Sequence, residues 1–313
     1  MYTGKAVIIG DGLVGSTTAY TLTIGGLFSK ISIIDIDKNK AEGDALDISH
    51  GVSFVPPVKI LSEDYDTCRD ADIIIIAAGV SQKSGEDRMD LLRRNYEVFQ
   101  SIVPNITKYC KSDVVIIVVT NPVDILTYAT YKLSGLDSHQ IIGSGTVLDT
   151  SRLKYLISDH VGVDMRDIST YIIGEHGDSE VAIWSLTDVA GLCVQDYCKA
   201  CGKCQGLEMK EMHKKVIDAA YEIIEKKGAT YYAVALAVSR IVEAIVRNEN
   251  SVLTVSSFID DIYGVNDICL SLPTVMGKGG AKKILEVPLS EEEANGLKNS
   301  AQVMRKALTE IGL

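Results

Sequence analysis

The segment YIIGEHGDSEVAIWS, residues 171–185, holds a histidine in a setting suited to acid–base chemistry. His176 ends an apolar run and stands between two glycines. The other four histidines have ordinary polar or amphipathic sequence neighbours; they are His50, His139, His160 and His213. A histidine placed like His176 can be a general acid or base, a metal ligand or a structural residue. No second histidine or cysteine stands nearby at ligand spacing, which argues against a metal site.

Asp149 and Arg152, in the segment LDTSR, are candidates to complete such a site. They are three residues apart, so a helix would place both on one face. The planar guanidinium of Arg152 suits bidentate binding of a carboxylate. Asp149 could accept a hydrogen bond from one nitrogen of His176 and stabilise the imidazolium. The alternative is a surface ion pair, worth about 0.3–0.5 kcal/mol.

The segment GDGLVG indicates a dinucleotide site, because it follows a strand-like run and opens a helix. In such a motif Gly10 allows the tight turn, Gly12 lets a pyrophosphate approach the backbone, and Gly15 permits close helix–strand packing. Asp35 ends the second strand-like run, where an acid would bind the ribose hydroxyls and repel a 2′-phosphate. The sequence therefore predicts NAD rather than NADP; the alternative is a glycine-rich turn with a capping Asp.

Together these residues favour hydride transfer to a 2-keto acid. That reaction needs a proton donor at the developing alkoxide and a cation for the carboxylate. It also needs a second donor or cation to polarise the carbonyl, and a means of excluding water.

Composition limits the other functions. A formal net charge of −11 argues against nucleic acid as a partner, and it leaves attraction of an anionic substrate to locally placed arginines. No leader segment and no apolar run of about 18 residues is visible, which argues against a membrane. The seven cysteines are read as reduced thiols. We expect a cytoplasmic protein.

The order of apolar runs predicts an α/β fold in two parts. Five near-continuous apolar runs alternate with helical segments, which indicates a Rossmann-type doubly wound parallel sheet. They are residues 5–10, 30–37, 72–79, 113–121 and 140–145. An α+β substrate-binding domain should follow, with a long helical stretch broken near KKGAT, antiparallel strands over 251–277 and a final helix after PLSEEE. The expected domains are 1–145 and 146–313.

Six motifs identify a family resemblance. GDGLVG, QKSGEDRMDLLRRN, TNPVDILTY, IGSGTVLDTSRL, GEHGDSE and LSLPTVMG occur in the order seen in the lactate/malate dehydrogenase family. The chain resembles that family over essentially its whole length, and within it the bacterial L-lactate dehydrogenases. The resemblance implies an NAD-dependent oxidoreductase, a homo-oligomer (a tetramer or a dimer), acting in glycolysis and fermentation.

The resemblance also implies roles for individual residues. His176 becomes the proton donor and acceptor, Asp149 its orienting partner and Arg152 the carboxylate clamp. Arg88 ends a segment, residues 79–88, that is similar to the family's mobile lid, and it would polarise the carbonyl. Asn121 would reach substrate and nicotinamide from before a cis Pro122. Further substrate contacts are implied at Gln82, Asp124 and Thr230. The implied cofactor contacts are Gly10, Gly12, Val14, Gly15, Asp35, Lys40, Tyr65, Gly79, Val80, Ser101, Thr120, Asn121 and Ser144.

Gln82 bears on the choice of substrate. Malate enzymes of the family carry an arginine at this lid position, because a second buried carboxylate needs a compensating cation. A neutral amide favours pyruvate, and Thr230 is consistent with a small uncharged substituent. We therefore expect reversible reduction of pyruvate to L-lactate. Malate dehydrogenase or another L-2-hydroxy acid dehydrogenase is the alternative, and a non-catalytic NAD sensor or a structural reuse of the fold belongs to other classes.

Two features depart from the family pattern or stand outside it. Relatives activated by fructose 1,6-bisphosphate carry an arginine and a histidine where this chain has Lys154 and Ser169, which predicts weak or absent activation. The segment CVQDYCKACGKC brings four cysteines together, whose spacing could bind zinc or an iron–sulfur cluster. The fourth ligand is poorly placed, so we expect adventitious thiols and no metal. The four are Cys193, Cys198, Cys201 and Cys204.

Overall fold

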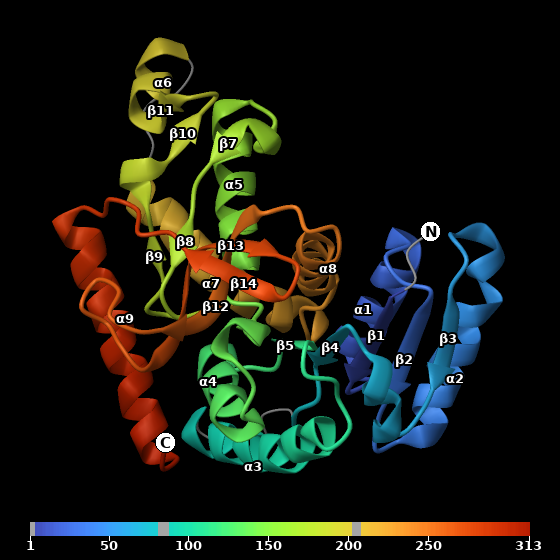
Figure 1. Cartoon of the computed structure of the whole chain (residues 1–313). Helices are drawn as coiled ribbons and strands as arrows, with labels where there is room; N and C mark the ends of the chain where they lie inside the picture. Colours follow the sequence, from blue (N-terminus) through green and yellow to red (C-terminus); the bar gives the residue numbers. More distant parts are fainter. Residues whose placement is uncertain (1–3, 81–87, 202–207) are drawn as a thin grey trace.

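A computed structural model describes residues 4–80, 88–201 and 208–313. Its centre is a nine-stranded sheet in the order β14-β13-β12-β6-β5-β4-β1-β2-β3 (Figure 1). The six strands from β3 to β6 are parallel, in the order of a doubly wound dinucleotide-binding sheet. They are β1 (Lys5–Ile9), β2 (Lys30–Ile34), β3 (Lys59–Ser62), β4 (Ile73–Ile76), β5 (Val115–Val118) and β6 (Ile141–Gly143).

Helices cover both faces of the parallel strands. Every residue of β1, β4 and β5 is therefore buried. Ala6 and Ile8 of β1 face a core with α1 (Leu13–Gly25), α2 (Lys38–His50) and α8 (Tyr232–Val246). Val7 and Ile9 face a second core with α3 (Arg88–Thr107) and α4 (Val123–Ser134). The alternation of a strand therefore supplies two cores from one apolar run.

The second half of the chain begins with α5 (Val147–Val161) and continues through short strands to two long helices. The short elements are β7 (Ile168–Ser169), β8 (Ile172–Ile173), β9 (Val181–Ala182), β10 (Asp188–Val189), β11 (Leu192–Cys193) and α6 (Val194–Cys201). The helices α7 (Met209–Lys227) and α8 follow, and the interruption between them falls at the predicted KKGAT segment. The final helix, α9 (Glu291–Glu310), begins with a capping box of Ser290 and Glu293.

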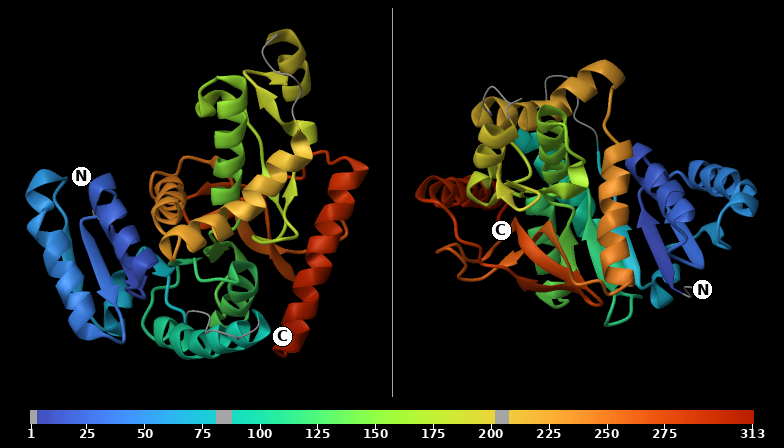
Figure 2. Two further views of the ribbon diagram at one scale, coloured as in Figure 1. Left: turned by 180° about the vertical axis from the view of Figure 1, so that it is seen from behind. Right: turned by 90° about the horizontal axis from the view of Figure 1, so that it is seen from above.

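The antiparallel strands continue the parallel sheet across the expected domain boundary. The strands β12 (Ser251–Ile259), β13 (Ile268–Gly277) and β14 (Gly280–Ile284) form a meander, and β12 joins β6 through Ser256 and Gly143. In addition, α8 packs against α1 on the sheet of the first half (Figures 1 and 2). The two parts of the chain thus share a sheet and a core.

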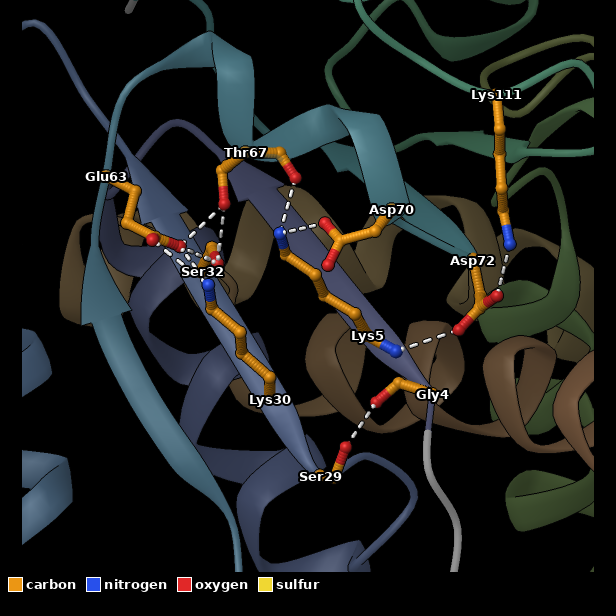
Figure 3. A network of polar contacts seen from close by, with 10 residues as sticks. All are labelled: Gly4, Lys5, Ser29, Lys30, Ser32, Glu63, Thr67, Asp70, Asp72 and Lys111. Atoms are coloured by element: carbon orange, nitrogen blue, oxygen red, sulfur yellow. Dashed lines mark hydrogen bonds and ion pairs between the residues drawn. The ribbon is translucent and has the colours of Figure 1, made fainter.

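Polar side chains fix the β3 edge of the sheet (Figure 3). Glu63, which follows β3, accepts hydrogen bonds from the Ser32 hydroxyl at 2.5 Å, the Thr67 hydroxyl at 2.6 Å and the Lys30 ammonium at 3.0 Å. Burial alone would raise the pKa of Glu63, but these three donors lower it to about 2. The carboxylate therefore holds β2, β3 and the following 3₁₀ segment (Tyr65–Asp70) together.

Lys5 of β1 ties the same segment from the neighbouring strand. Its buried side chain donates to the Thr67 carbonyl and to the Asp70 carboxylate, both at 2.5 Å. Its backbone N–H donates to Asp72 at 2.8 Å, and Lys111 binds the other oxygen of Asp72 at 2.5 Å. Every charged group drawn in Figure 3 thus has a partner of opposite charge.

No helix of the described residues is both long and apolar enough to cross a bilayer. Among the same residues, no three His, Cys, Asp or Glu side chains come together in a way that could hold a metal ion. Cys193 is exposed on β11, while Cys198 and Cys201 lie in α6, and Cys204 lies outside the described residues.

Candidate active site

The glycine loop after β1 has the geometry that a dinucleotide requires. Gly10 has φ +97°, and a Cβ there would lie 2.3 Å from the Ala78 nitrogen. A Cβ on Gly15 would lie 1.8 Å from the Gly10 carbonyl oxygen, so α1 could not pack against the loop. A Cβ on Gly12 would meet nothing within 4 Å, and Gly12 begins α1 without a side-chain cap. The amino end of α1 therefore faces open space, where its N–H groups fit a phosphate.

Asp35, at the end of β2, is held beside this loop. One of its carboxylate oxygens accepts the Asp11 N–H at 2.6 Å, and the other accepts the Asp37 N–H at 2.9 Å. Lys40 binds the Asp11 carboxylate at 3.0 Å, the Asp11 carbonyl and, at 2.6 Å, Asp44. Burial, more than the neighbouring Asp44, raises the pKa of Asp11 to about 6. Asp11 is a buried acid of the loop to which sequence reasoning gave no role.

The ends of β4 and β5 meet next to the glycine loop. The Thr120 hydroxyl donates to the Ala78 carbonyl at 2.7 Å, and a Cβ on Gly79 would lie 2.5 Å from the Thr120 methyl carbon. The buried amide of Asn95 bridges the two strand ends, since it accepts the Val80 N–H at 2.8 Å and donates to the Asn121 carbonyl at 3.0 Å. Asn95 lies within a quoted motif, but its bridging role needed the fold to be seen.

The other predicted cofactor residues divide into two groups. Val14 lies in the first turn of α1, Tyr65 begins the 3₁₀ segment after β3, and Ser144 follows β6, where its N–H donates to Val118 at 2.8 Å. These positions follow strand ends, as ligand-binding residues do in such sheets. Ser101 is exposed on α3, six residues beyond Asn95, and the structure does not link it to the strand ends.

His176, Asp149 and Arg152 come together from α5 and the loop after β8. The Asp149 carboxylate is 2% exposed; one oxygen lies 2.5 Å from His176 Nδ1 and the other 2.8 Å from Arg152 Nη1. The spacing of three residues along α5 turns both side chains to the same face, as predicted. Asp149 is therefore a buried carboxylate between two cationic groups rather than a member of a surface pair.

The buried carboxylate determines the charge of His176. Burial by itself would lower the pKa of His176, but the charge of Asp149 and its hydrogen bond outweigh this and raise it to about 9. The pKa of Asp149 is lowered, because His176 and Arg152 outweigh the effect of burial. At neutral pH the imidazole is thus protonated on both nitrogens, and Nε2, the nitrogen not bound by Asp149, carries a proton.

Asp124 and Asn121 complete the polar side of the site. Asp124, in the first turn of α4, accepts the His176 N–H at 2.7 Å and so fixes the backbone at His176. Burial raises the pKa of Asp124 to about 6. Asn121 precedes Pro122 through a cis peptide bond, as the family resemblance implied.

A cavity of about 440 Å³ opens beside these groups. Asn121, Asp149, Arg152 and His176 line its polar side together with three further acids, and apolar residues of α3, α4, α7 and α9 line most of the rest. The three acids are Glu175, Asp178 and Glu180. In the view from behind, α7 runs obliquely across the molecule toward α9 (Figure 2). Thr230 lies in the α7–α8 connection and is not among the described residues that line this cavity. Gln82 lies outside the described residues, and for Arg88 the structure describes only the backbone, at the start of α3.

The predicted effector positions lie on the outer part of the second half. Lys154 lies on α5 and the exposed Ser169 on β7. Asp188 of β10 pairs with Ser169 in the strand register, and its charge acts on Lys154. Burial nevertheless lowers the pKa of Lys154. This surface therefore combines one lysine with one acid.

Comparison with known proteins places the chain in a family. Residues 4–143 match the family model of the lactate/malate dehydrogenase NAD binding domain, and residues 146–312 match that of the lactate/malate dehydrogenase alpha/beta C-terminal domain. The chain belongs to the lactate/malate dehydrogenase family. It is thus an NAD-dependent oxidoreductase, and the predicted family, cofactor and doubly wound α/β fold are confirmed.

Similar curated proteins within this family are L-lactate dehydrogenases. The chain is 54% identical over 308 residues to L-lactate dehydrogenase 1 of Clostridium acetobutylicum, covering 98% of each chain. It is 53% identical over 310 residues to the L-lactate dehydrogenase of Acetivibrio thermocellus, covering 99% of this chain and 98% of the relative.

Solved structures agree in fold. A lactate dehydrogenase enzyme from a Medee basin deep-sea metagenome library matches with TM-score 0.96 and 40% identity, covering 100% of both chains. The minor L-lactate dehydrogenase from Enterococcus mundtii, in a ligand-bound form, matches with TM-score 0.96 and 37% identity over 99% of both chains.

Proposed function

We propose that this protein is an L-lactate dehydrogenase that reversibly reduces pyruvate to L-lactate with NADH. The observation that carries the proposal is the group of Asp149, His176 and Arg152 beside a cavity at the carboxyl end of the NAD-binding sheet. The near full-length L-lactate dehydrogenase relatives support the same reaction. Bound NADH supplies the hydride that adds to the carbonyl carbon of pyruvate.

The protein's own residues supply the proton and the orientation. Arg152 binds the pyruvate carboxylate, for which its guanidinium fork is suited. His176 Nε2 donates its proton to the carbonyl oxygen as the hydride arrives, which yields the lactate hydroxyl and a neutral imidazole. Asp149 holds the proton on Nδ1 and so keeps Nε2 directed at the substrate. In the direction of lactate oxidation, the neutral imidazole takes the proton back.

Gln82 is the proposed selector between pyruvate and oxaloacetate. The test is kcat/KM for NADH-dependent reduction of both acids by the wild type and by Gln82→Arg. A preference for pyruvate that shifts toward oxaloacetate in the variant supports the function and the selector. A wild type that prefers oxaloacetate makes the protein a malate dehydrogenase. If neither acid is turned over, bulkier 2-keto acids are the next substrates to test. The non-enzymatic alternatives follow if these also fail.

Fructose 1,6-bisphosphate should activate the enzyme weakly or not at all. A bisphosphate needs several cations or donors, whereas Lys154 stands near the acid Asp188 and Ser169 carries no charge. The measurement is the pyruvate KM with and without the bisphosphate. A tenfold activation at about 10 μM effector, the order expected of a tight phosphate site, contradicts the proposal.

A homo-oligomer, a dimer or a tetramer, is the proposed assembly. Large apolar side chains are exposed on α1, α2 and α8, and such surfaces mark protein interfaces. They include Leu13, Tyr20, Ile24, Leu46, Tyr232 and Leu236. Light scattering after gel filtration measures the mass; a value of about 34 kDa, that of a monomer, contradicts the proposal. We place the enzyme in the cytoplasm, where it would reoxidise NADH in fermentation; fractionation of cells tests the location.

A further inference from the structure

Glu180 is a buried acid whose place the reaction described above does not explain. It lies four residues after His176 and is 6% exposed. Its Oε1 faces His213 Nε2 of α7 at 3.4 Å. Neither atom makes a hydrogen bond with the described residues, although both are buried. A buried carboxylate with one distant partner is expensive for stability, so a role in the reaction is the better explanation.

The charges around Glu180 come from three elements. Asp149 of α5, His176 of the catalytic loop and His213 of α7 all act on it electrostatically. Glu180 also lines the same cavity as Asp149 and His176. Asp124 of α4 also acts on the imidazole, and Arg152 binds Asp149. His176 is therefore surrounded by three carboxylates, and Glu180 is the one that faces α7.

The protonation of Glu180 is poised near neutrality. Burial raises its pKa to about 7; the charge of Asp149 raises it further, while His213 and His176 oppose the rise. The negative charge of Glu180 in turn raises the pKa of His176. Loss of His213 would leave Glu180 with less to balance its charge, so the pKa of Glu180 would rise further.

We propose that Glu180 and His213 form a positioning pair that keeps the catalytic His176 protonated and couples its charge to helix α7. The inference rests on the proposed reduction of pyruvate, because that reaction requires a protonated imidazole. His213 favours the ionised form of Glu180, and ionised Glu180 stabilises the imidazolium together with Asp149 and Asp124. A second contact ties α7 to the catalytic loop, since the Tyr221 hydroxyl donates to Asp178 at 2.9 Å.

The test is the pH dependence of kcat/KM for pyruvate between about pH 5.5 and pH 10. Activity falls on the basic side as His176 loses its proton. In Glu180→Gln we expect the apparent pKa of this limb to drop by about 0.5–1 unit, and in His213→Gln, which keeps the carboxylate, we expect a smaller drop in the same direction. The larger shift corresponds to about a three- to tenfold loss of kcat/KM above the wild-type pKa, with little change near pH 6. Glu180→Asp should restore part of the shift.

Lys214→Gln is the matched control, because it removes a positive charge from the exposed residue next to His213. It should leave the basic limb where it is in the wild type. A limb that moves less than about 0.2 unit in both pair variants, or a loss that is equal at every pH, overturns the proposal.

Two complications have their own measurements. If Glu180→Gln does not fold, the pH profile of His213→Gln is compared with that of Lys214→Gln. A basic limb that has the same apparent pKa in both variants overturns the proposed pair. If the wild type does not reduce pyruvate, the proposed function fails separately. NMR titration of His176 then reads the pair without turnover: a lower pKa in the pair variants supports it, and an unchanged one overturns it.

Discussion

Glu63 is half-buried and Glu180 is buried, and their surroundings shift their pKa values in opposite directions. Three donors reach Glu63 within 3.0 Å, and its pKa falls to about 2 (Figure 3). Glu180 faces one imidazole at 3.4 Å, and its pKa rises to about 7. Deeper burial raises the pKa of Glu180, whereas three close donors outweigh the weaker burial of Glu63.

The same contrast separates the two regions as wholes. At the sheet edge Lys5 holds Asp70 and lowers its pKa, so the charges there are fixed over the physiological range. In the active site burial raises the pKa of Asp124 to about 6, while that of His176 reaches about 9. Groups that titrate near neutrality are suited to proton transfer, and groups that are fully paired are suited to stability. Each region should therefore respond to substitution in its own way.

The largest effect should follow Asp149→Asn. The amide no longer fixes the imidazole or stabilises its charge, so we expect kcat/KM for pyruvate to fall by about 10²–10⁴-fold. Asp70→Asn, in the sheet-edge network, is the control and should leave kcat/KM unchanged, because Asp70 does not line the cavity. Steady-state kinetics measures both variants. A loss below about tenfold in Asp149→Asn would remove Asp149 from its assigned role.

Arg152→Lys should have the next largest effect. The ammonium keeps the charge but loses the bidentate hydrogen bonds to the substrate carboxylate, which are worth about 1.5–3 kcal/mol. We expect kcat/KM for pyruvate to fall by about 10–100-fold, mainly through KM. The KM for NADH serves as the internal control and should change little. Equal increases in both KM values would point to a general disturbance of the fold instead.

Glu63→Gln should lower stability by about 1–2 kcal/mol at pH 7 and leave kcat/KM unchanged. The folded pKa of Glu63, about 2, lies below its ordinary value of 4.5. Its contribution is therefore fully present above about pH 4.5 and disappears as the pH falls toward 2. Urea unfolding of both proteins at pH 7 and near pH 3 measures the difference. A difference in unfolding free energy between the two proteins that is larger near pH 3 than at pH 7 would contradict this account of the network.

Lys111→Gln should have the smallest effect, below about 0.5 kcal/mol. The Lys111–Asp72 pair is close, at 2.5 Å, but its side chains are 32% and 42% exposed. Asp72 also keeps the Lys5 N–H as a donor at 2.8 Å. Urea unfolding at low and high salt measures the change. A loss comparable to that of Glu63→Gln would show that exposure does not decide the strength of these pairs.

Local patterns in the sequence were enough for much of this fold and site. The five long apolar runs became β1, β2, β4, β5 and β6, and the glycines, Asp149 and Arg152 were placed by spacing alone. The short β3 escaped notice because KILS is four residues long and begins with a lysine. The union of β12 with β6 also escaped notice, since antiparallel strands in a second domain carry no local sign of joining a parallel sheet.

Residues whose roles depend on distant partners were not found. Asn95 reaches Asn121, and Lys5 reaches Thr67, across intervals that no local periodicity links. His213 looked like an ordinary residue of an amphipathic helix, whereas it faces the buried Glu180. Glu180 lay inside the quoted GEHGDSE motif, and an acid so near the catalytic histidine was the available signal. Its burial could be known only after α7 had been placed.

The packing of α8 on the first-half sheet has a consequence for synthesis on the ribosome. The face formed by Ala6, Ile8 and their neighbours is covered partly by α8, which ends at Val246. About 100 residues separate that point from the end of β6, so translation at 5–20 residues per second leaves the face bare for roughly 5–20 s. During that interval the nascent nucleotide-binding half presents a row of isoleucines to solvent, which makes it a natural client for chaperones that shield apolar surface.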